Sequence, residues 1–506
     1  MSMNEKMSTA AAHHDHESLS EVKHADDALL AQLGYKSEFK REFSMIETIA
    51  FAFSIMGVVA SVSSTMSFPL VSGKRTRRDG IWMALPSLFV MTIAASLAEL
   101  TSAMPYNECR LYYFSAKLAP KKWAPLASWI TGWANVTGQV TLVCSIDFTC
   151  VGSDGAVNLG AGATFGILLA ILFTHGIVCS AATSVLARLN LFYVAINVGT
   201  TVAAIIALLV CSGDQRVDTK TASPCAWAFL LAFTSPMWTL TGSHISEETP
   251  GRPRAPIAIM VGVGATASLG WLLYIAASFA AASVPALLDT SLPLPMGQLF
   301  LDVLGKRGML AIWSLIIVVQ YVTGAAQGVD ASRVVFAFAR DNALPGSRWW
   351  KRMHPYTRTP VNAVWLVMVL AGLCGLLGFS EAALSSLAGA SVIGLYTSYV
   401  VPIFLRITSG RTRLVPGPFS LGKWFLPIGI VAVSWVLFIT VVLLFPSESN
   451  PSAETMNYAV VIIMGVFFFA SISWVVSARK WFEGPVKYDR KSFSEVMEKE
   501  VSVDGS

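Results

Sequence analysis

The chain has 506 residues, of which 54% are hydrophobic and only 13% charged, and its mean hydropathy is +0.60. Soluble domains carry roughly 25% charged residues, and a charge is costly in hydrocarbon, so this composition excludes an ordinary soluble protein and predicts an all-α polytopic membrane protein. The net charge of +5 is small, and we expect no nucleic-acid partner.

Residues 1–44 form a polar stretch that we interpret as a cytosolic N-terminal tail. It lacks the apolar core of a cleaved secretory signal. Seven cysteines occur along the chain, mostly inside apolar runs and without paired spacing. We therefore predict no disulfide framework, no metal site and no cofactor.

One transmembrane domain is predicted for residues 45–477, followed by a cytosolic C-terminal tail at 478–506. A spanning helix needs about 20 apolar residues. Twelve stretches meet this rule. They are 45–70, 81–104, 126–150, 162–182, 191–211, 225–243, 256–283, 309–338, 361–379, 382–405, 424–445 and 456–477.

The basic residues orient these spans, because cytosolic loops carry an excess of Lys and Arg. With the N-terminus in the cytosol, the inner loops hold 24 basic residues and the outer loops hold eight. Four of those eight lie together in 73-GKRTRRDG-80 and break the rule locally. The overall bias predicts that both termini are cytosolic.

The first span is almost wholly apolar, yet Gly57 interrupts it and hydroxyl residues crowd its second half. Gly57 lies roughly 18 Å along the helix at 1.5 Å per residue, which is near the bilayer midplane. Two interpretations stay open. Either Gly57 marks a break whose free backbone groups face a ligand, or small residues there allow another helix to pack closely.

Polar residues in the second and third spans also have two interpretations each. Glu99, near the inner end of the second span, is either a gate residue paired with a cytosolic-side arginine or a solvated carboxylate. Asn135 and Gln139 are four residues apart and share a helix face, where they bind substrate or join helices. Asp147, near the outer end of the third span, belongs to a gate or is an ordinary interfacial carboxylate.

His175 lies deeper, in the fourth span. An imidazole titrates near neutral pH and suits proton transfer. The alternative is a packing histidine with satisfied hydrogen bonds, on a helix that does not face the transport pathway.

The sixth span contains Pro236, which removes a backbone donor in mid-span. Trp238, Thr239, Thr241 and Gly242 follow it. Interruptions in spans one and six are typical of two inverted five-helix repeats, although proline also kinks ordinary membrane helices.

Further polar groups lie at the inner mouth and on the eighth span. Glu247 and Glu248, beside Arg252 and Arg254, form either a cytosolic gate or a solvated loop. The eighth span offers three residues that bind substrate or join helices, namely Gln320, Tyr321 and Gln327.

The stretch 27-DALLAQLGYKSEFKREFSMIETIAFAFSIMG-57 resembles the opening of fungal amino-acid, GABA and choline permeases. These form the amino acid/choline transporter family of the amino acid–polyamine–organocation superfamily. The resemblance covers about residues 27 to 487. Further matching strings are 98-AELTSAMP-105, 144-CSIDF-148, 235-SPMWT-239, 339-ARDNALPGSRWWKRMHP-355, 360-PVNAV-364, 416-PGPFSLGKW-424, 453-AETMNYAVVI-462 and 478-ARKWFEGPV-486.

This resemblance implies twelve spans in a five-plus-five inverted-repeat fold with broken helices 1 and 6, and uptake of an amino acid or related amine by proton symport. It implies that the substrate carboxylate meets the backbone of the first span, and that the amino or side-chain end meets the sixth. The first segment comprises Ser54, Ile55, Met56, Gly57, Val58, Val59 and Ala60. The second comprises Trp238, Thr239, Leu240, Thr241, Gly242 and Ser243.

The sequence departs from the family pattern at three places. The connector 104-MPYNECRLYYF-114 lacks the usual glycine pair, 73-GKRTRRDGIW-82 replaces a short outer loop, and 238-WTLTGSHISEE-248 is about four residues shorter than usual. The last departure touches the implied binding segment. It keeps open the alternative to the importer, which is a non-transporting sensor or degenerate member with a transporter fold.

A membrane enzyme is the third hypothesis, and no motif supports it. The chain contains no phosphate-binding P-loop, no His-Glu-x-x-His helix and no Gly-x-Ser-x-Gly elbow. We therefore expect a transporter whose partners are a small amine or amino acid, protons and membrane lipid. The plasma membrane is the expected location, and the oligomeric state stays open.

Overall fold

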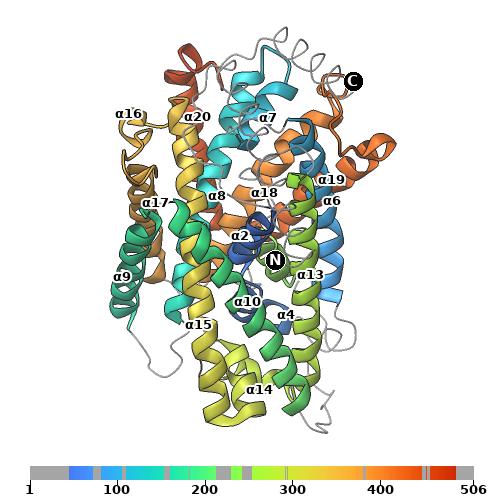
Figure 1. Ribbon diagram of the computed structural model, residues 1–506, viewed down its shortest axis with the longest axis vertical. Coiled ribbons are helices and arrows are strands. Elements are labelled where there is room, and N and C mark those ends of the chain that lie inside the picture. Colours follow the sequence, from blue (N-terminus) through green and yellow to red (C-terminus); the bar gives the residue numbers. More distant parts are fainter. Residues whose placement is uncertain are drawn as a thin grey trace, which may run out of the picture.

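The computed structural model of the chain is a bundle of α-helices that run mostly along its long axis (Figure 1). It describes residues 45–71, 81–104, 110–152, 160–181, 183–211, 230–241, 254–290, 292, 294–379, 383–446, 452 and 456–485. Within these ranges the regular structure is helical and no strand occurs. The predicted all-α membrane fold is thus confirmed.

Nine helices in the described residues are long and apolar enough to cross a membrane. They are α6 (Ile81–Ala103), α9 (Ala161–Cys179), α10 (Thr183–Cys211), α13 (Arg254–Ala280), α15 (Pro295–Arg340), α17 (Val361–Cys374) with the 3-10 turn η2 (Gly375–Phe379), α18 (Ala383–Ile407), α19 (Phe425–Leu444) after η3 (Gly422–Trp424), and α20 (Ala459–Val476).

The other three predicted spans are helical but differ from these nine. The first is divided into α2 (Met45–Met56), α3 (Val58–Thr65) and α4 (Ser67–Val71). The third is α8 (Ala124–Gly152), which is long but carries many polar side chains. The sixth contains only the short helix α12 (Thr234–Thr239) within its described part. All twelve predicted stretches therefore contain helix.

Two helix starts differ from the sequence prediction. The eighth span was expected at 309–338, but α15 begins at Pro295 and passes through Gly305, whose φ of 67° marks a kink between two merged helices. The fifth span was expected from residue 191, but α10 begins at Thr183. In both cases charged residues near the start lower the local hydropathy without stopping the helix.

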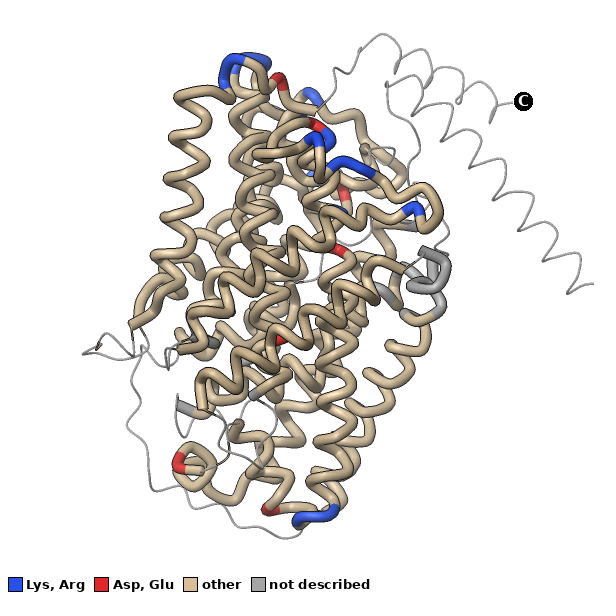
Figure 2. The backbone as a smooth tube through the Cα atoms, turned by 90° about the vertical axis from the view of Figure 1, so that its left-hand side faces the viewer, with Lys and Arg blue, Asp and Glu red and all other residues tan. Residues whose placement is uncertain are grey.

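Short helices lie at the two ends of the bundle, three of them between spans and the last of them after α20. These are α7 (Arg110–Leu118), α14 (Val284–Leu288), α16 (Ser347–Trp350) and η4 (Ala478–Lys480). Figure 2 shows that the described Lys and Arg residues gather at the two ends, mostly at the end that carries α7 and α16 in Figure 1. The middle of the bundle is nearly free of charge, as a bilayer core requires.

The helices divide into inner and outer ones. In α18, 78% of its apolar 18-residue segment is buried, whereas in α20 only 17% of the corresponding segment is buried. The central helix α8 packs against α18 and α15, and α3 packs against α10, α12, α13 and α15. The outer helices expose large apolar side chains such as Phe468 and Leu437. These side chains suit contact with lipid.

Candidate functional site

The first span is broken at Gly57. This residue has φ 43° and ψ 61°, in the left-handed region, between the end of α2 and the start of α3. A Cβ added there would lie 2.5 Å from Oγ1 of Thr323 on α15. Glycine is required both for the backbone conformation and for the close approach of α15, so a break and a close helix contact coincide at Gly57.

Three of the last four carbonyl groups before the break have side-chain donors. Side chains from three different helices donate to them, so the negative end of α2 is neutralised. The donors and acceptors are Asn197 Nδ2 to Phe53 O (3.1 Å), Thr323 Oγ1 to Ser54 O (3.0 Å) and Ser61 Oγ to Met56 O (2.8 Å).

The amide groups after the break are arranged differently. Val58, Val59 and Ala60 form the first turn of α3, where N–H groups have no intrahelical acceptor, and within the described residues no side chain caps this end. All three residues are buried. The start of α3 therefore presents free N–H groups and a partial positive charge inside the bundle, an arrangement that binds anions.

The hydroxyl residues of α3 mostly serve their own helix. Ser63 donates to Val59 O at 2.6 Å, and Ser64 donates to Ala60 O at 2.7 Å. Thr65 donates to Ser61 O and also meets Ser235 of α12, which in turn contacts the hydroxyl of Tyr274. These contacts hold α3, α12 and α13 together at the C-terminal end of α3.

In the sixth span, Trp238 is buried on α12 and its Nε1 has no acceptor within the described residues. The hydroxyls of Thr239 and Thr241 instead donate to backbone carbonyls of their own segment, at 2.9 and 2.6 Å. Trp238 is thus the side chain of this segment with a free donor. The other predicted residues here lie outside the described residues: Gly242, Ser243, Glu247 and Glu248.

The two polar residues on the shared face of α8 have different surroundings. Asn135 is buried, and its Oδ1 has no donor in the described structure. Gln139 donates to Asp330 Oδ2 of α15 at 2.6 Å and accepts a hydrogen bond from Gln327. Gln139 therefore joins α8 to α15, whereas Asn135 keeps an acceptor free.

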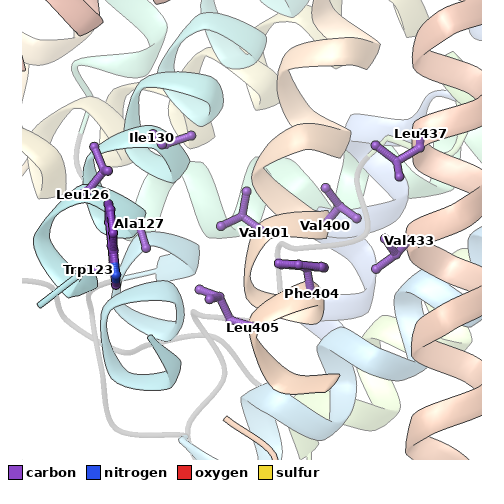
Figure 3. Close-up of a pocket in the computed structure, with 10 residues that line it drawn as sticks. All are labelled: Trp123, Leu126, Ala127, Ile130, Val400, Val401, Phe404, Leu405, Val433 and Leu437. Atoms are coloured by element: carbon purple, nitrogen blue, oxygen red, sulfur yellow. The ribbon is translucent and has the colours of Figure 1, made fainter. Parts of the chain in front are cut away.

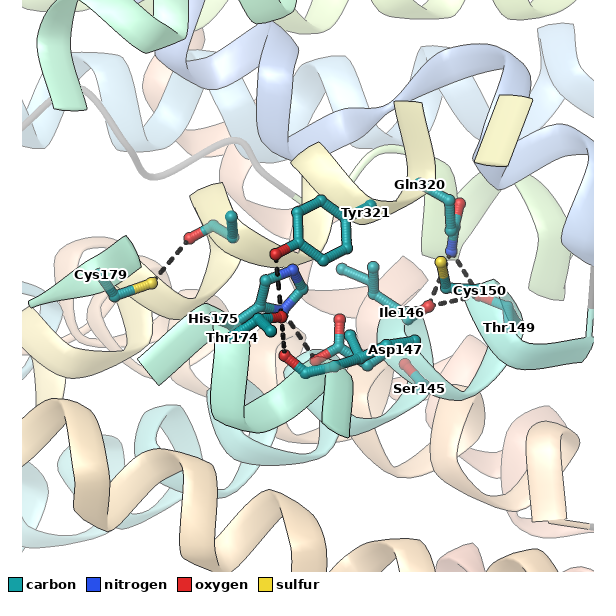
Figure 4. Close-up of polar contacts among 12 residues, drawn as sticks. Ser145, Ile146, Asp147, Thr149, Cys150, Thr174, His175, Cys179, Gln320 and Tyr321 are labelled. Atoms are coloured by element: carbon teal, nitrogen blue, oxygen red, sulfur yellow. Dashed lines mark hydrogen bonds and ion pairs between the residues drawn. The ribbon is translucent and has the colours of Figure 1, made fainter. Parts of the chain in front are cut away.

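Asp147 of α8 and His175 of α9 form a pair, with His175 Nδ1 3.0 Å from Asp147 Oδ2 (Figure 4). Both side chains are 0% exposed, so Asp147 is not a carboxylate at the water interface. Tyr321 of α15 lies against the imidazole, with ring centres 4.4 Å apart and ring planes tilted by 49°, and donates to Thr174 at 2.9 Å. The structure thus places Tyr321 beside α9.

Glu99 lies near the opposite end of the bundle, 3.5 Å from Nη2 of Arg406 on α18. The Arg406 guanidinium also donates to the carbonyl of Arg411 at 3.0 Å and lies over the ring of Phe425 at 4.3 Å. Ser420 reaches the same carboxylate at 3.4 Å. The pair links α6 to α18 on the arginine-rich side of the bundle.

Two grooves on the outer surface do not suit an amino acid. One, of about 370 Å³, lies between α8, α18 and α19 (Figure 3), and the other, of about 310 Å³, lies between α9 and α17. Neither is lined by a charged or amide side chain. A zwitterion needs polar partners when it leaves water, so the broken helix is the better candidate.

The sequence analysis missed the residues that support the break, chiefly Thr323 and Asn197. A signal for Thr323 was present, because Gln320, Thr323 and Gln327 are spaced by three and four and share one face of α15. Gln320 donates to Ile146 O of α8 at 3.0 Å. One polar face of α15 therefore contacts both the broken span and α8.

Comparisons with known proteins match most of the chain. The family model described as amino acid permease matches residues 43–468. An uncharacterised amino-acid permease of Schizosaccharomyces pombe is 35% identical, covering 92% of this chain and 90% of the relative. Amino-acid permease BAT1 of Arabidopsis thaliana is 33% identical, covering 90% and 95%. The GABA-specific permease of Saccharomyces cerevisiae is 32% identical, covering 91% and 86%.

Proposed function

Because the chain belongs to the amino acid permease family, we propose that it imports an amino acid or related amine by proton symport with alternating access. The chain is an integral membrane transporter rather than an enzyme. The proposed substrates are GABA, neutral amino acids and choline. The proposed location is the plasma membrane, with both termini in the cytosol.

The observation that best supports this proposal is the arrangement of backbone groups at the start of α3. Its free N–H groups at Val58, Val59 and Ala60 form a buried anion site, whereas the carbonyls across the break are already bonded. A substrate carboxylate placed there accepts hydrogen bonds from these N–H groups and is stabilised by the helix dipole. It needs no Lys or Arg side chain for its binding. This geometry favours GABA and neutral amino acids over choline, which has no carboxylate.

The rest of the substrate would then lie toward α12 and α8. Trp238 offers a buried donor, and Asn135 and Ser54 each offer a buried oxygen without a partner in the described residues. Leaving such groups unpaired costs free energy. A bound polar molecule would satisfy these groups, with its amino group donating to Asn135 Oδ1 and Ser54 Oγ.

Glu99 and Arg406 are proposed to form part of the cytosolic gate. They join α6 to α18 at the arginine-rich end, and alternating access requires that this end opens when substrate leaves. An ion pair of two nearly buried groups closes such an exit and separates once water enters.

The test is uptake in yeast that lacks its own permeases. Cells producing the chain would receive labelled GABA, choline or a neutral amino-acid mixture, each with and without an uncoupler, and surface protein would be quantified. We expect uptake of GABA or a neutral amino acid that the uncoupler abolishes. Uptake that ignores the uncoupler would contradict proton symport.

Competition separates the carboxylate site from general amine binding. Unlabelled GABA should block uptake, whereas butylamine, which has the same chain and amine but no carboxylate, should not. Preferential uptake of choline would contradict the assigned role of α3. A chain present at the surface that takes up none of these substrates would contradict the importer and favour a sensor.

A further inference from the structure

The pair of Asp147 and His175 has properties that helix packing alone does not require. Both side chains are fully buried in the membrane-spanning bundle. One atom of each is used in the contact between them, while Asp147 Oδ1 and His175 Nε2 have no partner in the described structure (Figure 4). A pair that only joined α8 to α9 would have these atoms satisfied or replaced by apolar groups.

The charge of the pair depends on one proton. With His175 neutral and donating from Nδ1, the ionised Asp147 gives the pair a net charge of −1. A second proton, on His175 Nε2 or on the carboxylate, makes the net charge zero. A buried uncompensated charge is costly, so the closed bundle favours the neutral form. A state that admits water tolerates the charged form.

Titratable side chains surround the pair on five helices. Cys144, Cys179 and Tyr321 interact with Asp147 or His175 directly, whereas Cys374, Tyr193 and Arg333 interact with those neighbours. Among these groups only Arg333 carries a full positive charge at neutral pH. Arg333 lies nine residues beyond Gly324, which is about 13 Å along α15, and it has other interactions. The remaining groups are Cys144 on α8, Cys179 on α9, Tyr193 on α10, Tyr321 on α15 and Cys374 on α17.

The helix α15 connects the pair to the substrate site through two adjacent residues. Gly324 lies against the pair, since a Cβ there would be 2.1 Å from Asp147 Oδ1 and 2.8 Å from His175 Cε1. Thr323 donates to Ser54 O and lies against Gly57 at the break. A change in the spacing between Asp147 and α15 therefore shifts the residue that supports the broken span.

We propose that Asp147 and His175 bind the transported proton, and that α15 couples their protonation to the broken span through Thr323 and Gly324. The proposal rests on the proton-symport function above. A proton from the outside water binds the pair and makes it neutral, which permits the bundle to close around the substrate. Opening to the cytosol rehydrates the pair, and the proton leaves to water with no other bond made or broken.

The test uses purified protein in liposomes with a labelled substrate identified by the uptake screen. Two activities are measured: accumulation driven by an inward pH gradient, and counterflow exchange without a gradient. Asp147→Asn keeps the size of the side chain but cannot ionise. We expect it to lose gradient-driven accumulation and to retain exchange. His175→Gln, whose amide still donates to Asp147, should shift or flatten the pH dependence of accumulation.

Cys179→Ser is the matched control. Cys179 lies one turn after His175 and donates to Ala325 O of α15 at 3.3 Å, a bond that serine preserves. This variant should accumulate substrate like the wild type. Accumulation by Asp147→Asn that equals the wild type and has its pH profile would overturn the proposal.

A readout independent of transport separates this proposal from the function on which it rests. A pH jump followed by infrared difference spectroscopy should show a protonated-carboxyl band in the wild type that Asp147→Asn lacks. The same band in both proteins would exclude Asp147 as the proton site, even if the wild type is proton-coupled. Transport that is insensitive to the gradient in the wild type would instead contradict the proposed symport.

Discussion

The helices α8 and α20 both belong to the bundle but have opposite characters. On α20 the apolar window has a mean hydropathy of 2.5, and only 17% of it is buried. On α8 a series of polar side chains is buried, including Asn135, Gln139 and Asp147, and the helix is not among the nine classed as apolar spans. Hydropathy therefore identifies the helices that face lipid best, and the helices that build the site least well.

The same contrast extends to the two broken spans. The segments α3 and α12 are short and polar for a membrane, and they lie inside the bundle against each other, with α3 also against α15 and α12 also against α18. Backbone that leaves a helix needs protein around it in a bilayer. Substitutions on these inner elements should thus affect transport, whereas matched substitutions on α20 should not.

The largest effect is expected at the break. Gly57→Val places a branched side chain on a left-handed residue and against Thr323, 2.5 Å from the Cβ position. Because misplacing a site by about 1 Å can cost roughly 100-fold, we expect uptake to fall by about that factor. Uptake normalised to surface protein measures it.

The control for this substitution is Gly465→Ala on α20, where a Cβ would meet no atom within 4 Å. It should leave uptake unchanged. Near-normal uptake by Gly57→Val would show that the break is not needed for transport and would remove the proposed carboxylate site.

A stability effect is expected where α8 meets α15. Gln139→Leu removes the donor to Asp330 and the acceptor for Gln327, and both partners stay buried. The buried amide of Gln327 then loses the acceptor for its Nε2 donor, and an unsatisfied buried donor costs about 1–3 kcal/mol. The melting temperature of the purified protein in detergent should therefore fall by several degrees.

The matched change on the outer helix is Ser471→Leu, since Ser471 is exposed on α20. It should leave the melting temperature unchanged or raise it slightly in lipid. An equal fall in both variants would mean that the α8–α15 network adds nothing beyond general helix packing.

The fold was largely predictable because its signals are local. Twelve apolar stretches could be counted, and Gly57 and Pro236 marked the two interrupted spans. The starts of α10 and α15 were missed because charged residues such as Arg188, Lys306 and Arg307 extend these helices beyond the apolar stretch. Hydropathy detects the bilayer-length part of a helix and not its continuation outside.

The site was predictable only in part because its contacts join distant residues. A break at Gly57 was one of two interpretations of the sequence, but its support by Thr323 requires the packing of α15 on α3. His175 and Asp147 were interpreted separately from the sequence, and only the fold pairs them. Glu99 was interpreted with an arginine partner, but Arg406 is more than 300 residues away.

A moderate effect on substrate binding is expected at Trp238. Trp238→Phe keeps an aromatic ring and removes the buried Nε1 donor. One hydrogen bond contributes about 0.5–1.5 kcal/mol, so KM should rise roughly twofold to tenfold with little change in the maximum rate. Trp474→Phe on α20 is the control, because Trp474 packs against the rings of Trp129 and Phe482, away from the broken spans, and its KM should equal that of the wild type.

The smallest effect is expected in α7, which packs against α8 and α18 outside the spans. Burial lowers the pKa of Lys117 from 10.5 to about 8. Between these values the unfolded chain binds more protons than the folded one, so this residue makes stability rise with pH across that range. The destabilisation caused by burying the charged amine is fully present below about pH 8 and is gone above 10.5.

Lys117→Met should abolish the rise in melting temperature, of about a degree, that the wild type shows across this pH range. Lys480→Met, at an exposed position just after α20, should preserve that rise. Identical pH profiles for the wild type and Lys117→Met would show that packing against the inner helices does not desolvate this amine.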